Sequence, residues 1–159
     1  MKPYADTNFF TRLYLPLPDS PDADELADVA RRGDSPPLPI LWLHRVEFVN
    51  ALQLHVFAGR QPGHIRITPE QAAMAWAWFR QDLTDSTFLG LARVSDAVLE
   101  RQFEELALRH TARHGFRTYD LLHVASALTL ECDAFWTFDR RTRELAGLEG
   151  LKTAAHGQG

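Results

Sequence analysis

Short apolar runs alternate along this chain with segments that carry helix-start signals. Such alternation is the βαβ pattern of a mainly parallel sheet with helices beside it. The apolar runs predict strands at Lys2–Ala5, Leu38–Leu43, Thr87–Val94, Ala134–Phe138 and Gly150–Thr153. The sequence therefore predicts the α/β fold class.

The segments between these runs begin with residues that favour helix starts. Thr68–Gln71 has the form of a capping box with proline at the first helical position, and Thr118 is placed to cap a helix over Tyr119–Glu131. Further helices are expected from Thr7 to near Pro16, over Pro21–Arg32, from Arg45, after Ser95 and from Arg140.

Length and composition suit one compact domain. With 159 residues, 45% of them apolar, the chain can bury a sizeable core. We expect a single domain over residues 1–153 and a loose tail over 154–159. The lone Cys132 fits a reducing compartment, and no apolar run is long enough to span a bilayer. These features predict a cytoplasmic protein without a membrane segment.

Four acidic residues stand where an apolar run ends or a helix begins: Asp6, Glu47, Asp120 and Asp139. Asp6 and Asp139 follow strands, whereas Glu47 and Asp120 are expected in the first turn of a helix. Strands of an open α/β sheet direct their carboxyl ends to one crevice, so these acids are expected to converge there. Uncompensated carboxylates repel one another, and bound divalent cations relieve that repulsion.

The ligand type indicates the chemistry of such a site. Mg²⁺ and Mn²⁺ take oxygen ligands and keep several waters, so a few carboxylates and the phosphate oxygens of a substrate suffice. Two ions about 3.5–4 Å apart can bind the attacking water and the leaving oxygen of an in-line displacement. Asn8 and Thr137, near the two strand ends, can hold carboxylates or waters in place. Metal-dependent hydrolysis of phosphodiesters is the first hypothesis.

Four blocks contain these acids in order: Tyr4–Asn8, Val46–Ala51, Arg117–Ala127 and Trp136–Asp139. In this order and spacing they resemble the PIN-domain ribonucleases, and within that family the VapC-type toxins of bacterial toxin–antitoxin pairs. The resemblance covers nearly the whole chain.

This resemblance implies a PIN-like three-layer sandwich with a mainly parallel five-stranded sheet flanked by helices. It also implies a Mg²⁺- or Mn²⁺-dependent endoribonuclease site formed by the four acids, an RNA substrate, a homodimer and inhibition by a cognate antitoxin protein. His44 stands just before Val46–Ala51, where relatives often carry a small hydroxyl residue, so a changed contact at the rim of the site is expected.

Each acid also has a plainer interpretation. Asp6 can cap the helix that follows it, and Asp120 can act in the same way. Glu47 can be an ordinary charge in a first helical turn. Asp139 can pair on the surface with the two arginines that follow it.

Three arginines flank the expected pocket: Arg117, Arg140 and Arg141. They can hold RNA phosphates through bidentate contacts, or they can form surface ion pairs. His123 lies three residues after Asp120 on one helix face. It could be a metal ligand or a proton carrier there, but a packed or hydrogen-bonded histidine is the preferred interpretation.

The helix after Thr68 carries Trp76, Trp78 and Phe79, which is too many apolar groups for one narrow stripe. These side chains are expected in the core, with a dimer or antitoxin surface as the alternative.

Other functions stay open. An aspartyl-nucleophile phosphatase would use Asp6, but Asn8 stands where that mechanism needs a second aspartate. A non-catalytic binding module would keep the fold without using cations. Within the PIN family, a housekeeping nuclease is the alternative to a toxin. The net charge of −4 argues against a protein that coats nucleic acid but does not exclude a nuclease.

Overall fold

The computed structural model describes residues 1–154. Their backbone divides into two compact units. The first contains Met1–Asp6 and the described residues from Arg93 onward, and the second contains Thr7–Ala92. The single domain expected over residues 1–153 stays a prediction. Of the expected tail, residues 155–159 lie outside the described part of the chain.

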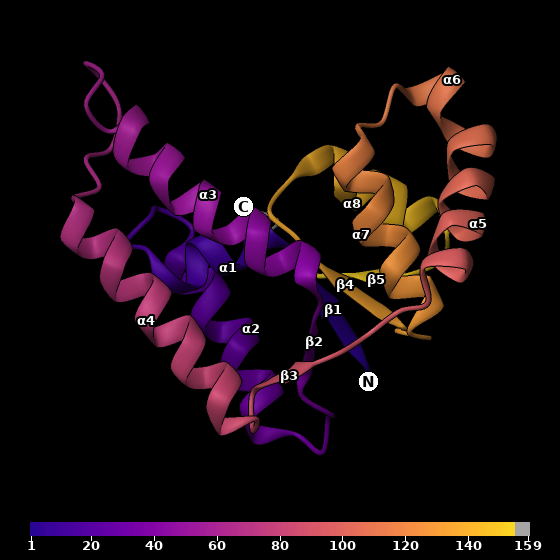
Figure 1. Cartoon of the computed structure of the whole chain (residues 1–159), viewed down its shortest axis with the longest axis horizontal. Helices are drawn as coiled ribbons and strands as arrows, with labels where there is room; N and C mark the ends of the chain where they lie inside the picture. Colours follow the sequence, from indigo (N-terminus) through magenta and orange to yellow (C-terminus); the bar gives the residue numbers. More distant parts are fainter. Residues whose placement is uncertain (155–159) are drawn as a thin grey trace. The chain divides into compact units, whose positions relative to one another are not determined.

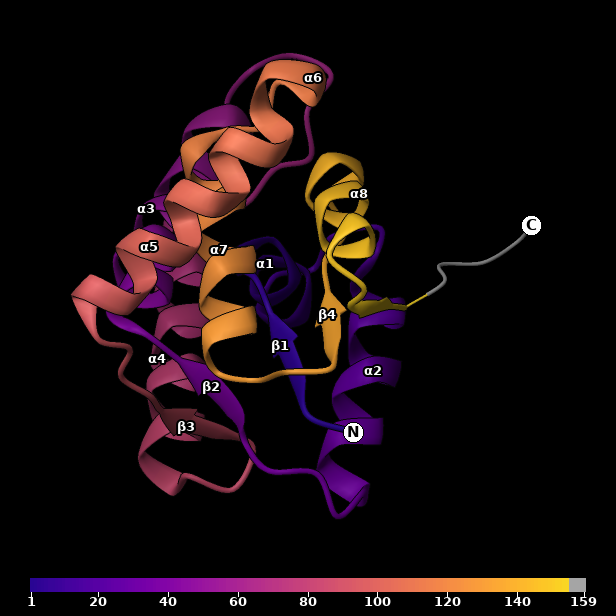
Figure 2. The same ribbon diagram turned by 90° about the vertical axis from the view of Figure 1, so that its right-hand side faces the viewer.

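A three-stranded parallel sheet in the order β1-β4-β5 forms the base of the first unit. Its strands are β1 (Pro3–Ala5), β4 (Ala134–Trp136) and β5 (Lys152–Thr153). β1 and β4 run side by side in the same direction (Figure 2). The N–H of Asp6 extends this ladder by donating to the carbonyl of Trp136 over 3.2 Å. The residues that follow the two strands therefore leave the sheet at the same end.

Helices make up most of the rest of the first unit. They are α5 (Asp96–Leu106), the π-helix η1 (Ala107–Thr111), α6 (Ala112–His114), α7 (Thr118–Thr129) and α8 (Arg140–Leu148). α7 packs against both α5 and α8, and from Leu121 to Ala127 it is buried at every position except Leu122. A helix that is apolar on all sides is typical of a central place in a core. The first turn of this well-anchored helix carries Asp120.

The second unit is largely helical. It contains α1 (Thr7–Tyr14), α2 (Ser20–Arg32), α3 (Trp42–Ala58) and α4 (Pro69–Asp85). α3 and α4 are its long helices, and they pack against each other and against α1 (Figure 1).

Aromatic rings form the centre of this second unit. The ring centroid of Phe79 lies 4.8 Å from that of Phe48 and 5.9 Å from that of Phe10. The three rings are fully buried. The expectation that the aromatic cluster of α4 is in the core is therefore confirmed for Phe79, whereas Trp78 is 52% exposed.

The expected five-stranded sheet is wrong. β2 (Leu38–Ile40) and β3 (Leu89–Leu91) form a separate, two-stranded parallel sheet in the second unit. β2 uses the N–H of Leu38 and the carbonyl of Ile40 on the edge that faces β3. Its other edge presents Pro39, which has no N–H to donate. A missing donor at the centre of a three-residue strand weakens any further pairing there. The α/β class is confirmed, and the PIN-like three-layer arrangement stays a prediction.

After β2 the chain becomes helical earlier than expected. The predicted strand Leu38–Leu43 is strand for three residues only, and α3 begins at Trp42. His44 explains the early start, because its Nδ1 accepts a 3.0 Å hydrogen bond from the N–H of Leu41 just before the helix. His44 is fully buried, so the expectation of a rim contact was wrong. Glu47 consequently lies in the second turn of α3, not in the first.

The predicted capping box at α4 is confirmed. The Thr68 hydroxyl accepts from the N–H of Gln71 over 3.1 Å, and the Gln71 side chain accepts from the N–H of Thr68 over 2.9 Å. Within residues 1–154, no helix has both the length and the apolarity needed to cross a bilayer.

Candidate active site

Asp6 and Thr137 meet where β1 and β4 end. Asp6 is 4% exposed, and Oδ2 of its carboxylate accepts a 2.6 Å hydrogen bond from the hydroxyl of Thr137. The same hydroxyl accepts from the N–H of Asp139 over 3.0 Å. Thr137 therefore ties the carboxylate of Asp6 to the backbone of Asp139, as expected for a residue that holds an acidic ligand in place.

Asp139 is the N-cap of α8. Its Oδ1 accepts from the N–H of Thr142 over 2.9 Å and from the Thr142 hydroxyl over 3.0 Å. Burial opposes ionisation of this carboxyl, but the two Thr142 bonds and the charge of Arg117 outweigh it and lower the pKa of Asp139 below its ordinary value. Capping was weighed for Asp6 and Asp120 but not for Asp139, so this role of Asp139 was missed.

Asp120 enters the same network from the first turn of α7. It is 7% exposed, and its Oδ1 lies 2.9 Å from the Thr142 hydroxyl, so Thr142 contacts two carboxylates at once. Asp120 also accepts from the N–H of Arg117 over 3.4 Å. Arg117, not the predicted Thr118, is therefore the N-cap residue of α7.

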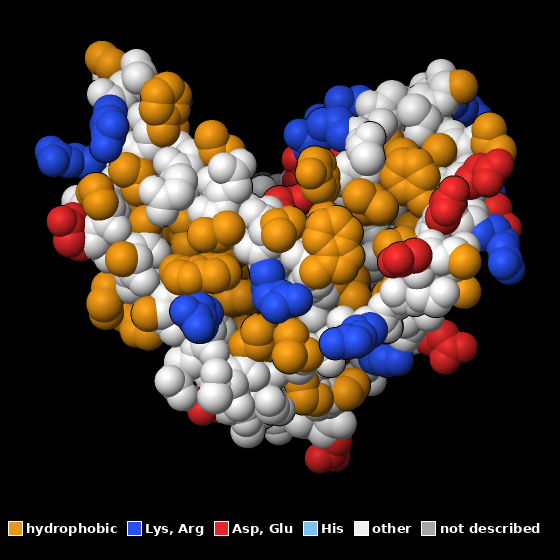
Figure 3. Space-filling view, viewed as in Figure 1, with side chains coloured by type: hydrophobic (Ala, Val, Ile, Leu, Met, Phe, Trp, Pro, Cys, Tyr) orange, Lys and Arg blue, Asp and Glu red, His pale blue; other side chains and the backbone are white. Residues whose placement is uncertain are grey.

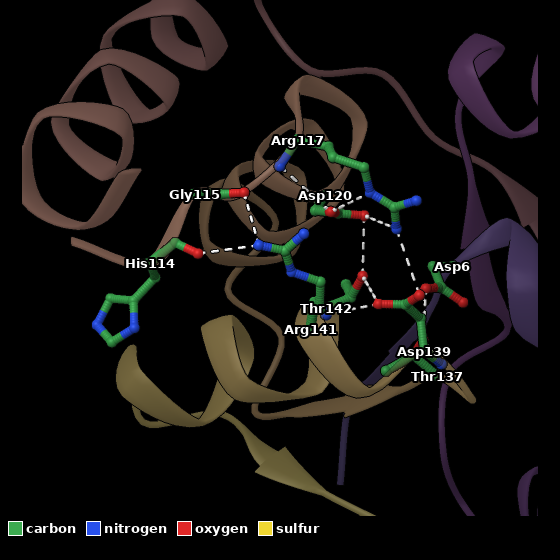
Figure 4. Close-up of polar contacts among 9 residues, drawn as sticks. All are labelled: Asp6, His114, Gly115, Arg117, Asp120, Thr137, Asp139, Arg141 and Thr142. Carbon is green, nitrogen blue, oxygen red and sulfur yellow. Dashed lines mark hydrogen bonds and ion pairs between the residues drawn. The ribbon is translucent and has the colours of Figure 1, made fainter. Parts of the chain in front are cut away.

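The guanidinium of Arg117 is the positive charge of this network (Figure 4). Its Nε and Nη2 form a bidentate pair with Asp120 over 2.9 and 3.2 Å, and Nη2 also donates to Asp139 over 3.3 Å. The bonds and charge of Asp120 raise the pKa of Arg117 above its ordinary value. The Arg117 side chain is 62% exposed, so it approaches the carboxylates from the solvent side.

Three of the four predicted acids are thus connected in one place. Asp6, Asp120 and Asp139 come from three elements and are linked through Thr137, Thr142 and Arg117 (Figure 4).

Glu47 and Asn8 belong to the other unit. Glu47 is half-buried on α3, and Asn8 is the second residue of α1, where its carbonyl accepts from Thr11 over 2.8 Å. Their predicted roles stay predictions.

The other two arginines of the predicted rim differ from Arg117. Nη2 of Arg141 donates to the carbonyls of His114 and Gly115 over 3.0 and 2.9 Å, which anchors the segment before Arg117 (Figure 4). The side chain of Arg140 is exposed and forms no hydrogen bond or ion pair with another of the described residues. Phosphate binding by either stays a prediction.

His123 is a packed residue, as the plainer interpretation had it. It is 3% exposed, and its Nδ1 lies 2.8 Å from the hydroxyl of Tyr4, which is also buried. The ring of Tyr4 stacks on Phe135 of β4. The two side chains join α7 to β1, at positions two residues before Asp6 and three residues after Asp120.

Sequence reasoning missed Thr142, and it assigned Arg117 only to phosphates or to surface pairs. Both residues stand three positions from an acid: Arg117 before Asp120 and Thr142 after Asp139. Residues three apart at a helix start are placed to bond to each other. This spacing was the available signal.

Hard divalent cations such as Mg²⁺ prefer oxygen ligands, and the carboxylates of this site offer them. Within residues 1–154, however, no group of three or more His, Cys, Asp or Glu side chains is arranged to hold one ion. Mg²⁺ commonly needs only one or two protein carboxylates, and Asp120 and Asp139 are the pair with shared partners.

Comparison with models of known protein families and with curated proteins finds no match to this chain. The resemblance to PIN-domain ribonucleases therefore rests on the four sequence blocks alone.

Proposed function

We propose that this chain is a metal-dependent endoribonuclease of the PIN type that hydrolyses RNA phosphodiesters. One observation carries the proposal: Asp6, Asp120 and Asp139, remote in sequence, share one hydrogen-bond network at the ends of β1 and β4 and the starts of α7 and α8. Buried carboxylates cost free energy unless they are compensated, and active sites commonly retain such groups for their chemistry.

Asp6, Asp120 and Asp139 would hold Mg²⁺ or Mn²⁺, with Glu47 as the fourth acid that the resemblance implies. When bound, such an ion lowers the pKa of a coordinated water and neutralises phosphate charge. The Thr137 hydroxyl donates to Oδ2 of Asp6 and holds this carboxylate in one orientation, which would suit a group that takes the proton of the attacking water. Thr142 fixes Asp120 and Asp139 relative to each other. Arg117, Arg140 and Arg141 are the proposed phosphate contacts.

The experiment compares RNA cleavage by purified wild type and Asp6→Asn in Mn²⁺. Asparagine keeps the size of the side chain and an oxygen that accepts from Thr137, but it loses the negative charge. We expect a loss of activity of at least 100-fold, in line with the removal of one acid–base group. Equal activity in the two proteins would reject the site. Identical purification of both proteins controls for contaminating nuclease.

We further propose the role of a toxin that acts in the cytoplasm and is held inactive by an antitoxin protein. Induction of wild type, and not of Asp6→Asn, should then arrest cell growth. Unchanged growth in both, together with cleavage in vitro, would favour a housekeeping nuclease.

An apolar groove on the second unit supports the partner in this proposal. A cavity of about 640 Å³ lies along α3 and α4. Its apolar lining includes Trp42, Val46 and Leu91, each of which is at least 50% exposed. Arg45 and Arg80 also line it. Figure 3 shows hydrophobic side chains gathered over these helices with basic groups among them. Large exposed apolar patches mark interaction sites, and the two arginines favour an acidic, apolar segment of an antitoxin. The homodimer stays a prediction.

A non-catalytic binding module is the second candidate. The pairing of Arg117 with Asp120 and Asp139 favours it, because charges that are already compensated can persist without a cation. Calorimetry that detects no divalent-ion binding would favour this module over the nuclease. No contact in the described residues favours the aspartyl-nucleophile phosphatase. Trapping of a phosphoryl group on Asp6 would be the result that favours it over the nuclease.

A further inference from the structure

Arg117 occupies the carboxylate oxygens that a divalent ion would need. Both oxygens of Asp120 and Oδ2 of Asp139 accept hydrogen bonds from its guanidinium (Figure 4). Only Oδ1 of Asp139, which accepts from Thr142, lies outside this contact. A guanidinium and a metal ion carry the same sign of charge and compete for the same lone pairs, so they cannot both bind these oxygens in this way.

We propose that Arg117 is a built-in counter-ion of the candidate site: it holds Asp120 and Asp139 when no divalent ion is bound and leaves them when an ion enters. The inference rests on the proposed function. It explains how the chain tolerates two neighbouring carboxylates without metal.

The structure allows this exchange with little rearrangement. The Arg117 side chain is 62% exposed, whereas the side chains of Asp120 and Asp139 are 9% and 28% exposed. Arg141 anchors the preceding segment through the carbonyls of His114 and Gly115. Rotation of one arginine side chain into solvent therefore frees the oxygens while the backbone stays in place.

Thr142 keeps the two carboxylates in position after the arginine leaves. Its hydroxyl contacts Oδ1 of Asp120 and Oδ1 of Asp139, and its N–H also donates to Asp139. The released guanidinium remains next to the site, where its planar fork suits a phosphate oxygen of RNA. Arg117 is thus a positioning residue for the carboxylates in one state and a phosphate contact in the other.

The test measures Mn²⁺ affinity by calorimetry on the chelator-treated full chain. Arg117→Gln removes the competitor, and we expect its dissociation constant for Mn²⁺ to fall about tenfold, within the range of couplings between two linked binding events. Arg117→Lys keeps the charge but loses the fork, so its affinity should lie between those of wild type and Arg117→Gln. Arg140→Gln removes a positive charge next to Asp139 without breaking a side-chain contact to another described residue, so it should raise the affinity for Mn²⁺ much less than Arg117→Gln does.

Thermal unfolding gives a second readout that does not depend on activity. Without metal, Arg117→Gln should melt below wild type, because Asp120 is left buried without its charged partner. Added Mn²⁺ should raise the melting temperature of Arg117→Gln more than that of wild type.

The outcomes separate the two proposals. Equal Mn²⁺ affinity in wild type and Arg117→Gln, or an equal gain in Arg117→Gln and Arg140→Gln, would overturn the counter-ion while leaving the nuclease in place. Failure of both wild type and Arg117→Gln to bind Mn²⁺ would overturn both.

Discussion

At the residue scale, the single hydroxyl proton of Thr142 affects how two carboxylates of the site are hydrogen-bonded. Thr142 contacts Asp120 and Asp139 with one hydroxyl, which has one proton and can donate to only one of them at a time. Each carboxylate has a further donor: the guanidinium of Arg117 for Asp120 and the N–H of Thr142 for Asp139. The hydrogen bonds of the two carboxylates therefore depend on one another, and a change at one member of the network alters the bonding of the others.

This network makes the stability of the protein sensitive to acid through Asp139. Its folded-state pKa is lowered, so the ionised carboxylate contributes stability above its ordinary pKa of 3.8, and that contribution is lost as the pH falls through the lower folded-state value. Asp139→Asn keeps a capping oxygen but removes the charge. With a chelator present, we expect the variant to be about 1 kcal/mol less stable than wild type at pH 7. The difference should shrink as the pH falls below 3.8.

Urea unfolding from pH 7 to pH 3 measures this difference. Asp34→Asn, at an exposed position outside the network, controls for the loss of one carboxylate. A stability difference for Asp139→Asn that stays constant over this range would contradict the role given to the charge.

At the element scale, close backbone contacts fix how the helices end. Gly59 follows α3 with φ −65° and ψ −13°, a conformation that alanine adopts without strain. A Cβ there would nevertheless lie 2.8 Å from the carbonyl oxygen of Ile65 and 2.8 Å from the nitrogen of Ile67. The requirement for glycine at this position is therefore one of space.

Gly59→Ala should lower the free energy of unfolding by about 1–3 kcal/mol, as overpacking does. Gly147→Ala is the matched control, because a Cβ at this position in α8 meets nothing within 4 Å. That variant should gain about 0.5–1 kcal/mol from its helix propensity. Denaturant unfolding of both variants measures these changes, and a neutral Gly59→Ala would show that the segment after α3 moves freely.

Elements and partners were not equally predictable from the sequence. Patterning placed β1, β4, α7 and α8, and it put Asp6, Asp120 and Asp139 at their ends, because apolar periodicity and helix caps are local signals. It placed the start of α3 too late, since the buried cap formed by His44 replaces a usual hydroxyl or carboxylate cap. It allowed an ion pair for Arg117 but did not identify Asp120 and Asp139 as its partners, because a long side chain has many rotamers.

At the scale of the whole molecule, each of the two compact units has its own parallel sheet and its own buried core. The acidic network lies in the unit built on β1-β4-β5, and the apolar groove with Arg45 and Arg80 lies in the unit built on β2-β3. The proposal therefore assigns hydrolysis to the first unit and partner recognition to the second.

The products of RNA cleavage test the central claim most directly. Attack by water forms a bond from its oxygen to phosphorus, breaks one bond from phosphorus to a ribose oxygen and transfers a proton to that oxygen. Wild type in Mn²⁺ should therefore leave phosphomonoester and hydroxyl ends on a short RNA, and an excess of chelator should stop the reaction. Cyclic phosphate ends, or cleavage that continues in chelator, would contradict metal-dependent hydrolysis by Asp6, Asp120 and Asp139.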